Sequence, residues 1–341
     1  MQKQKKGVLL VNLGTPDSPS TSDVRKYLKE FLLDPRVIDI PWILRQFLVR
    51  GIIAPFRARS SAKLYKQLWT EDGSPLKHYG EVLEDKVQSE LGDDYKVVLA
   101  MRYQSPSIKS ALATFKEEKV NSIIVFPLFP QYASATTGSI HDEVMRLLRK
   151  EQVILPVSFI NSYPANEKMI TAFVDRSKGY STDDYDHALF SFHGLPVRQL
   201  KKADDCNHCQ IADDCCNTYS DKNRYCYSAQ CHVTAKEIAK KLELEPSQYS
   251  ICFQSRLGKD PWIQPYTSDI IEKQAKKGAK NLLVFCPAFV ADCLETTIEI
   301  SDEYQEEFEE LGGDKIQLVE SLNDHPLWLE TVTDMIRSTK V

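Results

Sequence analysis

Short apolar runs alternate with amphipathic helical stretches along most of the chain. Two stretches with helical periodicity, residues 107–119 and 268–277, each lead into an apolar run, residues 123–126 and 282–285. Apolar runs of this length that end at Gly, Pro or Ser are typical of buried strands. Strands separated by helices of this length are typical of parallel sheets with right-handed crossovers. The pattern therefore predicts an α/β protein.

Three pairs of segments resemble each other across the two halves of the chain, in the same order. They are Val11-Asn12-Leu13-Gly14-Thr15-Pro16 with Ser191-Phe192-His193-Gly194-Leu195-Pro196, Tyr103-Gln104-Ser105 with Phe253-Gln254-Ser255, and Ile124-Val125-Phe126-Pro127-Leu128-Phe129 with Val284-Phe285-Cys286-Pro287-Ala288-Phe289. Such a repeat indicates two related α/β units. We expect two similar Rossmann-like domains at residues 1–160 and 161–320, and a last helix within residues 321–341 that packs on the first domain.

The composition is that of an ordinary globular protein, with 42% hydrophobic and 27% charged residues. The length of 341 residues suits two domains. A net charge of −5 gives no reason to expect a nucleic acid as partner. No apolar run approaches the ~20 residues of a membrane-spanning helix, and no signal peptide is evident, so we expect a cytoplasmic protein.

A single histidine, His193, stands at the end of a predicted strand. The apolar run at residues 187–192 leads into it, and Gly194 and Pro196 end the run. Because ligands of open parallel sheets bind beyond the carboxyl ends of the strands, His193 is a candidate base, proton shuttle or metal ligand. A partly buried histidine bonded to a neighbouring carbonyl is the alternative.

Acidic residues follow another of the predicted strands. Glu295, Glu299, Glu303 and Glu306 recur at intervals of three and four, so a helix would carry them on one face. Together with His193 they indicate cation traffic, because a histidine facing a carboxylate offers either two metal ligands or a base and a proton acceptor. A plain solvated acidic face is the alternative, most of all for Glu303 and Glu306.

Residues 31–56 hold more apolar and aromatic side chains than one helical face can bury. The region also carries Arg45 and Arg50, and Arg57 and Arg59 follow it. This mixture is typical of a lip at a large apolar pocket, or of a surface that touches a membrane. An ordinary insertion packed on the first domain is the alternative.

Six of the nine cysteines fall within residues 206–231. The spacing C-x2-C-x5-C-C-x9-C, in an Asp- and Asn-rich stretch, contains Cys206, Cys209, Cys215, Cys216 and Cys226. In a reducing compartment such a cluster binds metal more often than it forms disulfides. Four thiolates hold either Zn²⁺ or a 2Fe-2S cluster. Unligated thiols in a loop are the remaining alternative.

Ordered motifs span nearly the whole chain. They are Val11-Asn12-Leu13-Gly14-Thr15-Pro16, Gly73-Ser74-Pro75-Leu76, Pro130-Gln131-Tyr132-Ala133-Ser134-Ala135-Thr136-Thr137-Gly138, Ser191-Phe192-His193-Gly194-Leu195-Pro196, Phe253-Gln254-Ser255-Arg256, Pro261-Trp262 and residues 289–296. In these motifs the chain resembles the ferrochelatases, which insert Fe²⁺ into a porphyrin. The resemblance implies a chelatase-like fold of two similar α/β domains, each with a parallel four-stranded sheet flanked by helices.

The resemblance also implies roles for individual residues. His193 is the proton acceptor or metal contact at the porphyrin nitrogens, and Glu295 is the acidic partner across the macrocycle. Glu299 and Glu303 continue this acidic path for the metal. The positions that line the porphyrin are Leu13, Arg102, Tyr103, Tyr132, Trp262 and Phe289. Residues 31–56 match the hydrophobic lip of the family, and arginines near it are suited to pair with porphyrin propionates.

Two departures from the family pattern affect these assignments. Many members have a second histidine two residues before the acid, where this chain has Cys293. The stretch 206–226 is an internal cysteine-rich insertion, and similarity to members with internal cysteines implies a 2Fe-2S cluster, with structural Zn²⁺ as the alternative. Cys215 and Cys216 are adjacent, and we expect one ligand from the two.

We therefore expect a lyase that inserts Fe²⁺ into protoporphyrin IX, releases two protons and makes protohaem. Coproporphyrin III is the alternative substrate, and a non-catalytic porphyrin or haem carrier on the same fold is the alternative class. The expected partners are a porphyrin, ferrous iron and, through the lip, the inner face of a membrane. The acidic line after Glu295 argues against a carrier, which has no use for a metal path.

Overall fold

A computed structural model describes residues 5–209, 214–258 and 260–340 of the chain. The chain divides into two compact units. The first consists of Met1–Phe129, Ala133–Asn161 and Leu329–Val341, and the second consists of Pro130–Tyr132 and Ser162–Trp328. The final helix α12 (Pro326–Ser338) therefore begins in the second unit and continues into the first.

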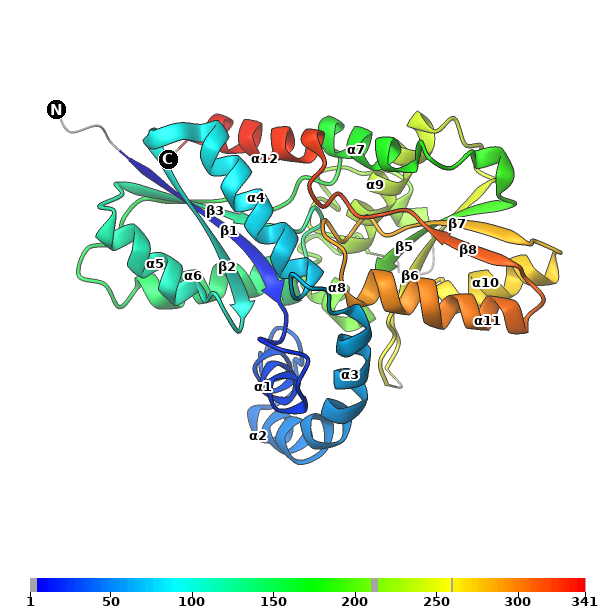
Figure 1. Ribbon diagram of the computed structural model, residues 1–341, viewed down its shortest axis with the longest axis horizontal. Helices are drawn as coiled ribbons and strands as arrows, with labels where there is room; N and C mark the ends of the chain where they lie inside the picture. Colours follow the sequence, from blue (N-terminus) through cyan, green and yellow to red (C-terminus); the bar gives the residue numbers. More distant parts are fainter. Residues whose placement is uncertain (1–4, 210–213, 259, 341) are drawn as a thin grey trace. The chain divides into compact units, whose positions relative to one another are not determined.

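The first unit alternates strands with helices in chain order (Figure 1). Its elements are β1 (Lys6–Gly14), α1 (Thr21–Leu32), α2 (Trp42–Phe47), η1 (Leu48–Ile53), α3 (Ala54–Leu68), α4 (Pro75–Leu91), η2 (Gly92–Asp94), β2 (Tyr95–Tyr103), α5 (Ile108–Glu117), β3 (Ser122–Pro127), η3 (Ser134–Gly138), α6 (Ser139–Leu148) and β4 (Val157–Phe159).

The second unit repeats this alternation. Its elements are α7 (Glu167–Ser177), η4 (Thr182–Asp184), β5 (His187–His193), α8 (Val197–Ala203), η5 (Asp214–Cys216), α9 (Tyr227–Lys241), β6 (Tyr249–Gln254), α10 (Thr267–Lys276), β7 (Asn281–Phe285), η6 (Leu294–Tyr304), α11 (Gln305–Glu310) and β8 (Lys315–Leu318).

Each unit contains a parallel four-stranded sheet, and the two sheets have the same topology. The strand order is β2-β1-β3-β4 in the first unit and β6-β5-β7-β8 in the second. All pairings are parallel, with registers such as Leu9↔Val98 and His193↔Gln254. The prediction of two similar Rossmann-like α/β units is confirmed. The strands and helices predicted around residues 107–126 and 268–285 are present within a few residues of the expected bounds.

Both faces of each sheet are covered, which explains why the strands read as continuous apolar runs. In the first unit Leu9 and Val11 of β1 pack with Phe115 of α5 and Val144 of α6 on one face. On the other face α4 approaches closely, because a Cβ on Gly80 would lie 2.9 Å from the side chain of Leu99. In the second unit Leu189 of β5 packs with residues of α10, η6 and α11.

The repeat extends to the segments that follow β3 and β7. Each is followed by a π-helical segment, η3 after β3 and η6 after β7. The acidic stretch after residue 294 is therefore wound as a π-helix up to Tyr304, and Glu306 lies beyond it in α11. Single π-helical turns are frequent at functional sites. The regular α-helix that we expected to carry all four glutamates on one face is thus wrong.

The predicted lip, residues 31–56, begins at the end of α1 and continues through α2 and η1 to the start of α3. Its helices α2 and α3 lie beyond the carboxyl end of β1 (Figure 1). Many of its apolar side chains are exposed: Trp42, Ile43, Leu44, Phe47, Ile52 and Phe56. Arg45 differs from the other lip arginines because it is buried, and its guanidinium donates to the carbonyl oxygens of Ile38 and Ile40. Within the described residues no helix is long and apolar enough to cross a bilayer.

Candidate active site

His193 is the last residue of β5, at the carboxyl end of the second sheet. Its Nδ1 lies 2.7 Å from the carbonyl oxygen of Gly194. A carbonyl oxygen only accepts hydrogen bonds, so Nδ1 must carry the proton in this contact. In the neutral ring the lone pair then sits on Nε2. Both expectations for His193 are thus compatible, because the bond to a neighbouring carbonyl leaves the other nitrogen available as a base.

The peptide group between His193 and Gly194 is held at both ends. The Gly194 N–H donates to the main-chain oxygen of Gln254 at 2.8 Å, and the hydroxyl of Tyr227 donates to the oxygen of His193 at 2.9 Å. Position 194 must be glycine, because a Cβ would lie 2.9 Å from the Gln254 oxygen and 3.1 Å from the Trp262 ring. Trp262 therefore packs over this peptide, 6.4 Å between its ring and that of His193.

The buried amide of Gln254 joins β5, β6 and η6. Its Oε1 accepts from Ser191 at 2.7 Å, and its Nε2 donates to the main-chain oxygen of Glu295 at 2.7 Å and to Glu299 Oε2 at 3.1 Å. Gln254 also pairs with His193 in the sheet. Gln254 thus brings His193, through its main chain, and Glu295 and Glu299, through its side chain, to the same end of the second sheet.

The acidic residues of η6 have different surroundings. Glu299 is fixed, because Ser255 donates to its Oε2 at 2.6 Å and Tyr304 donates to its Oε1 at 3.4 Å. Glu303 is exposed, and partial desolvation together with the nearby charges of Glu299, Asp302 and Glu306 raises the pKa of its carboxyl group. The secondary contribution of the three neighbouring charges shows that these carboxylates lie close enough to repel one another.

Cys293 stands where relatives were expected to carry a second histidine. It is buried and caps the start of η6. Burial, and after it the charge of Glu295, holds the pKa of its thiol well above the usual range. The thiol therefore stays protonated at neutral pH in its buried position.

Two further predicted porphyrin contacts lie in the second unit. Tyr132 is half-buried, its N–H donates to Gln230 Oε1 at 2.7 Å, and its ring lies 6.5 Å from that of Tyr225. Phe289 follows β7 and packs partly against the core beneath the sheet. Both present aromatic surface, but no described contact tests their role with a porphyrin.

The other three predicted porphyrin contacts lie in the first unit. Leu13 is half-buried near the end of β1. The side chains of Arg102 and Tyr103 bind the carboxylate of Asp34, at 2.7 and 2.9 Å. Burial, and after it the charge of Asp34, raises the pKa of Tyr103, which is almost fully buried. The polar groups of both side chains are therefore engaged within the first unit, and their contact with a porphyrin stays a prediction.

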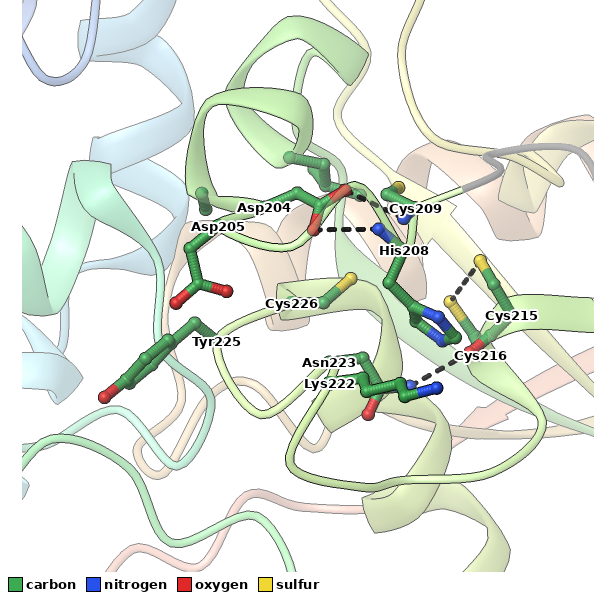
Figure 2. Close-up of a pocket in the computed structure, with 12 residues that line it drawn as sticks. Asp204, Asp205, His208, Cys209, Cys215, Cys216, Lys222, Asn223, Tyr225 and Cys226 are labelled. Carbon is green, nitrogen blue, oxygen red and sulfur yellow. Dashed lines mark hydrogen bonds between the residues drawn. The ribbon is translucent and has the colours of Figure 1, made fainter.

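A pocket in the second unit gathers most of the predicted thiol ligands (Figure 2). Its lining includes Cys209, Cys215, Cys216 and Cys226. Cys206 lies beside the pocket instead, exposed, with its Sγ 3.1 Å from the oxygen of Lys222. The loop is shaped by Asp204, whose carboxylate accepts from the N–H groups of residues 206, 208 and 209.

One thiol of this pocket, that of Cys226, has a lowered pKa. Cys226 stands at the start of α9. A hydrogen bond from Cys216 lowers the pKa of Cys226 against the effect of burial, and the same bond, together with burial, raises the pKa of Cys216. Four thiols line this one pocket, so the donor set fits a four-thiolate site whose remaining thiol protons would leave when metal binds. His208 also lines the pocket, and a set of three thiolates and one histidine would suit Zn²⁺.

Two parallel sheets of the same strand order, with a histidine and an acidic π-helix at the end of one, define a two-domain fold of the chelatase type. The structure is similar to SirB from Bacillus subtilis with Fe³⁺, at a TM-score of 0.52 and 12% identity, over 98% of this chain and 95% of that chain. It is also similar to the sirohydrochlorin chelatase SirB from Bacillus subtilis subspecies spizizenii in complex with cobalt, at a TM-score of 0.54 and 10% identity, over 98% and 94%. This likeness shows the fold.

The chain belongs to the ferrochelatase family, whose model matches residues 5–340. It is 44% identical over 332 residues to the ferrochelatase of Legionella pneumophila (strain Lens), covering 97% of this chain and 98% of that protein. It is 43% identical over 339 residues to the ferrochelatase of Coxiella burnetii (strain Dugway 5J108-111), covering 98% and 94%. The resemblance seen in the motifs is confirmed.

Three residues at these sites were not among the predicted site residues: Gln254, Tyr227 and His208. Gln254 belongs to the repeated Phe-Gln-Ser segment, and His208 lies between two of the clustered cysteines, so both had a signal in the sequence. Tyr227 had none, because only the folded chain brings its hydroxyl to the oxygen of His193.

The bridging amide generates a testable prediction. Replacing Gln254→Glu removes the donor to Glu295 and places a second carboxylate beside Glu299. Both changes destabilise the second unit by about 2–4 kcal/mol, which lowers Tm by roughly 5–10 °C. The measurement is thermal unfolding followed by circular dichroism.

The matched control for this prediction is the exchanged pair Gln254→Glu with Glu299→Gln. In this pair the amide at position 299 can donate to the carboxylate at position 254. The exchanged pair should therefore recover about half of the lost stability. A Gln254→Glu protein with unchanged Tm would contradict the bridging role.

Proposed function

We propose that the protein inserts Fe²⁺ into protoporphyrin IX and releases two protons. Family membership supports the reaction, and the observation that carries the assignment of the base is the bond from His193 Nδ1 to Gly194. That bond leaves Nε2 of the neutral ring to accept a pyrrole proton at the end of β5. The reaction balances: the porphyrin loses two N–H protons, and the resulting dianion binds the divalent metal through its four nitrogens, with no change of oxidation state.

The carboxylates of η6 are proposed to handle the metal and the released charge. Glu295 and His193 would contact the arriving Fe²⁺, because a carboxylate and an imidazole are two suitable ligands that leave positions open. Glu299 and Glu303 would continue a path for the cation. The charges of Glu299, Asp302 and Glu306 lie near Glu303, and a divalent cation would relieve their repulsion.

Aromatic surfaces are proposed to hold the macrocycle. Trp262, Phe289 and Tyr132 of the second unit would bind its flat face, and Leu13, Arg102 and Tyr103 of the first unit are further proposed contacts. A flat porphyrin shields its nitrogens, so holding it in a bent form part-way to the transition state would lower the barrier to metal entry.

The central test is a metalation assay with Fe²⁺ and either protoporphyrin or coproporphyrin. The protein should metalate protoporphyrin preferentially. His193→Ala should reduce kcat at least about 100-fold, because a general base typically contributes that much. Glu295→Gln should reduce it at least about tenfold, and Tyr249→Phe, at the amino end of β6, serves as the control with normal activity.

Three outcomes would contradict the proposal. Near-normal turnover by His193→Ala would remove the proposed base. Preference for coproporphyrin would change the substrate. Tight porphyrin binding by the unaltered protein without metal insertion would favour the carrier.

We propose further that the thiol pocket holds a 2Fe-2S cluster. Four thiols line one pocket, which fits a four-thiolate donor set. We propose Cys209, Cys215, Cys216 and Cys226 as the ligands, because these four line the pocket and Cys206 lies beside it. Both adjacent cysteines are thus proposed as ligands, in place of the one expected from the pair. Such a cluster supplies one-electron redox chemistry and ties the loop together when bound. Structural Zn²⁺ is the second candidate because His208 is also present.

Anaerobic purification followed by visible absorption and metal analysis tests the cluster. The expected result is a coloured protein with about two irons per chain and little zinc. Cys226→Ser should lose the colour, and Cys206→Ser should keep it. A colourless protein with one zinc per chain would refute the cluster, and loss of colour only in Cys206→Ser would refute the ligand set.

We propose lastly that the protein works in the cytoplasm at the inner face of a membrane. All nine cysteines are free thiols, as is usual in a reducing compartment. The lip exposes 65% of Trp42, 69% of Phe47 and 76% of Phe56. Apolar side chains so exposed, beside the exposed Arg50 and Arg57, suit the headgroup region of an anionic bilayer, which would deliver an apolar substrate.

Sedimentation with vesicles of mixed neutral and anionic lipid tests this contact. The unaltered protein should sediment with the vesicles, less so at high salt. Trp42→Ser with Phe47→Ser should reduce binding about tenfold or more. The control is Val153→Ser with Ile154→Ser, two exposed apolar residues elsewhere in the first unit. Equal binding by both double variants would contradict a role of the lip.

A further inference from the structure

The start of α9 lies between the thiol pocket and the predicted porphyrin site. Cys226 lines the pocket and directly precedes the helix. Tyr227, the next residue, is 7% exposed and donates its hydroxyl to the oxygen of His193 at 2.9 Å. Two consecutive residues therefore contact the thiol pocket and the strand end that carries the candidate base.

The next turn of α9 makes a second connection. Gln230 is fully buried, and its Oε1 accepts the N–H of Tyr132 at 2.7 Å. Its Nε2 donates to the oxygen of Arg224, within the cysteine-rich loop. Its own N–H donates to the oxygen of Cys226 at 3.0 Å. The main chain of Tyr132 is thus held by the helix that begins at the pocket.

The bond from Tyr227 acts on the geometry of His193. The peptide between His193 and Gly194 has its N–H held by Gln254 and its oxygen held by Tyr227. The orientation of this peptide fixes the direction of the chain at Gly194. It therefore fixes the position of the Gly194 carbonyl, which binds Nδ1 of His193. Releasing one end of the peptide therefore loosens the direction in which Nε2 points.

We infer that Tyr227 is a positioning residue for His193, and that the first two turns of α9 couple the thiol pocket to the porphyrin site. The inference rests on the proposed function, which assigns His193 as the base and Tyr132 as a porphyrin contact. Ligation of Cys226 would fix the start of α9. Through their hydrogen bonds, Tyr227 would then hold His193 and Gln230 would hold Tyr132. Loss of a ligand at Cys226 would loosen the same contacts.

The first test is Tyr227→Phe, which keeps the buried ring and removes only the hydroxyl. We expect kcat for Fe²⁺ insertion to fall about fivefold, the effect of one hydrogen bond, while KM for the porphyrin changes less than about twofold. The control Tyr249→Phe should leave both constants unchanged. An unchanged kcat in Tyr227→Phe would overturn the positioning role.

The second test uses a readout that does not need activity. In histidine-labelled protein without porphyrin, the ring signal of His193 is assigned by its loss in His193→Ala. We expect both Cys226→Ser and Tyr227→Phe to shift this signal. In the double variant the shift should equal that of Tyr227→Phe alone, because the hydroxyl carries the coupling.

Additive shifts in the double variant, or no shift in Cys226→Ser, would overturn the coupling. The pair Cys226→Ser with Tyr249→Phe is the control and should give the shift of Cys226→Ser. If the unaltered protein inserts no iron, the proposed function fails, and the ring signal still decides this inference.

Discussion

The site depends on how one peptide group is held at the end of β5. The peptide between His193 and Gly194 is bound at its N–H by Gln254 and at its oxygen by Tyr227. The next carbonyl, that of Gly194, then binds Nδ1 of the histidine. A ring anchored through Nδ1 presents Nε2 as the free base without any charged partner. The choice of tautomer therefore follows from main-chain geometry.

The fold could be predicted because the sequence repeats it. The paired segments around residues 11–16 and 191–196, and around 124–129 and 284–289, mark equivalent strand ends in two sheets of the same order. Parallel strands buried on both faces leave continuous apolar runs, which are easy to recognise. His193 and Glu295 were predicted as site residues for the same reason, since His193 ends β5 and Glu295 lies in the segment after β7.

The surroundings of these residues could not be predicted, because they depend on contacts between distant segments. Gln254 meets Glu299 only when β6 and η6 are folded, and Asp34 meets Arg102 only across the first unit. The π-helical winding of residues 294–304 is equally invisible in a spacing of three and four. The cysteine spacing does not show which thiols line the pocket: Cys206 is not among the lining residues, and its Sγ lies 3.1 Å from the oxygen of Lys222.

The central claim is that His193 holds its proton on Nδ1 and offers Nε2 as the base. The ¹⁵N chemical shifts of its ring nitrogens, measured without porphyrin at a pH where the ring is neutral, test it most directly. The account predicts a protonated Nδ1 and an unprotonated Nε2. A proton on Nε2 would contradict it, because the nitrogen next to the Gly194 carbonyl would then have no proton to donate.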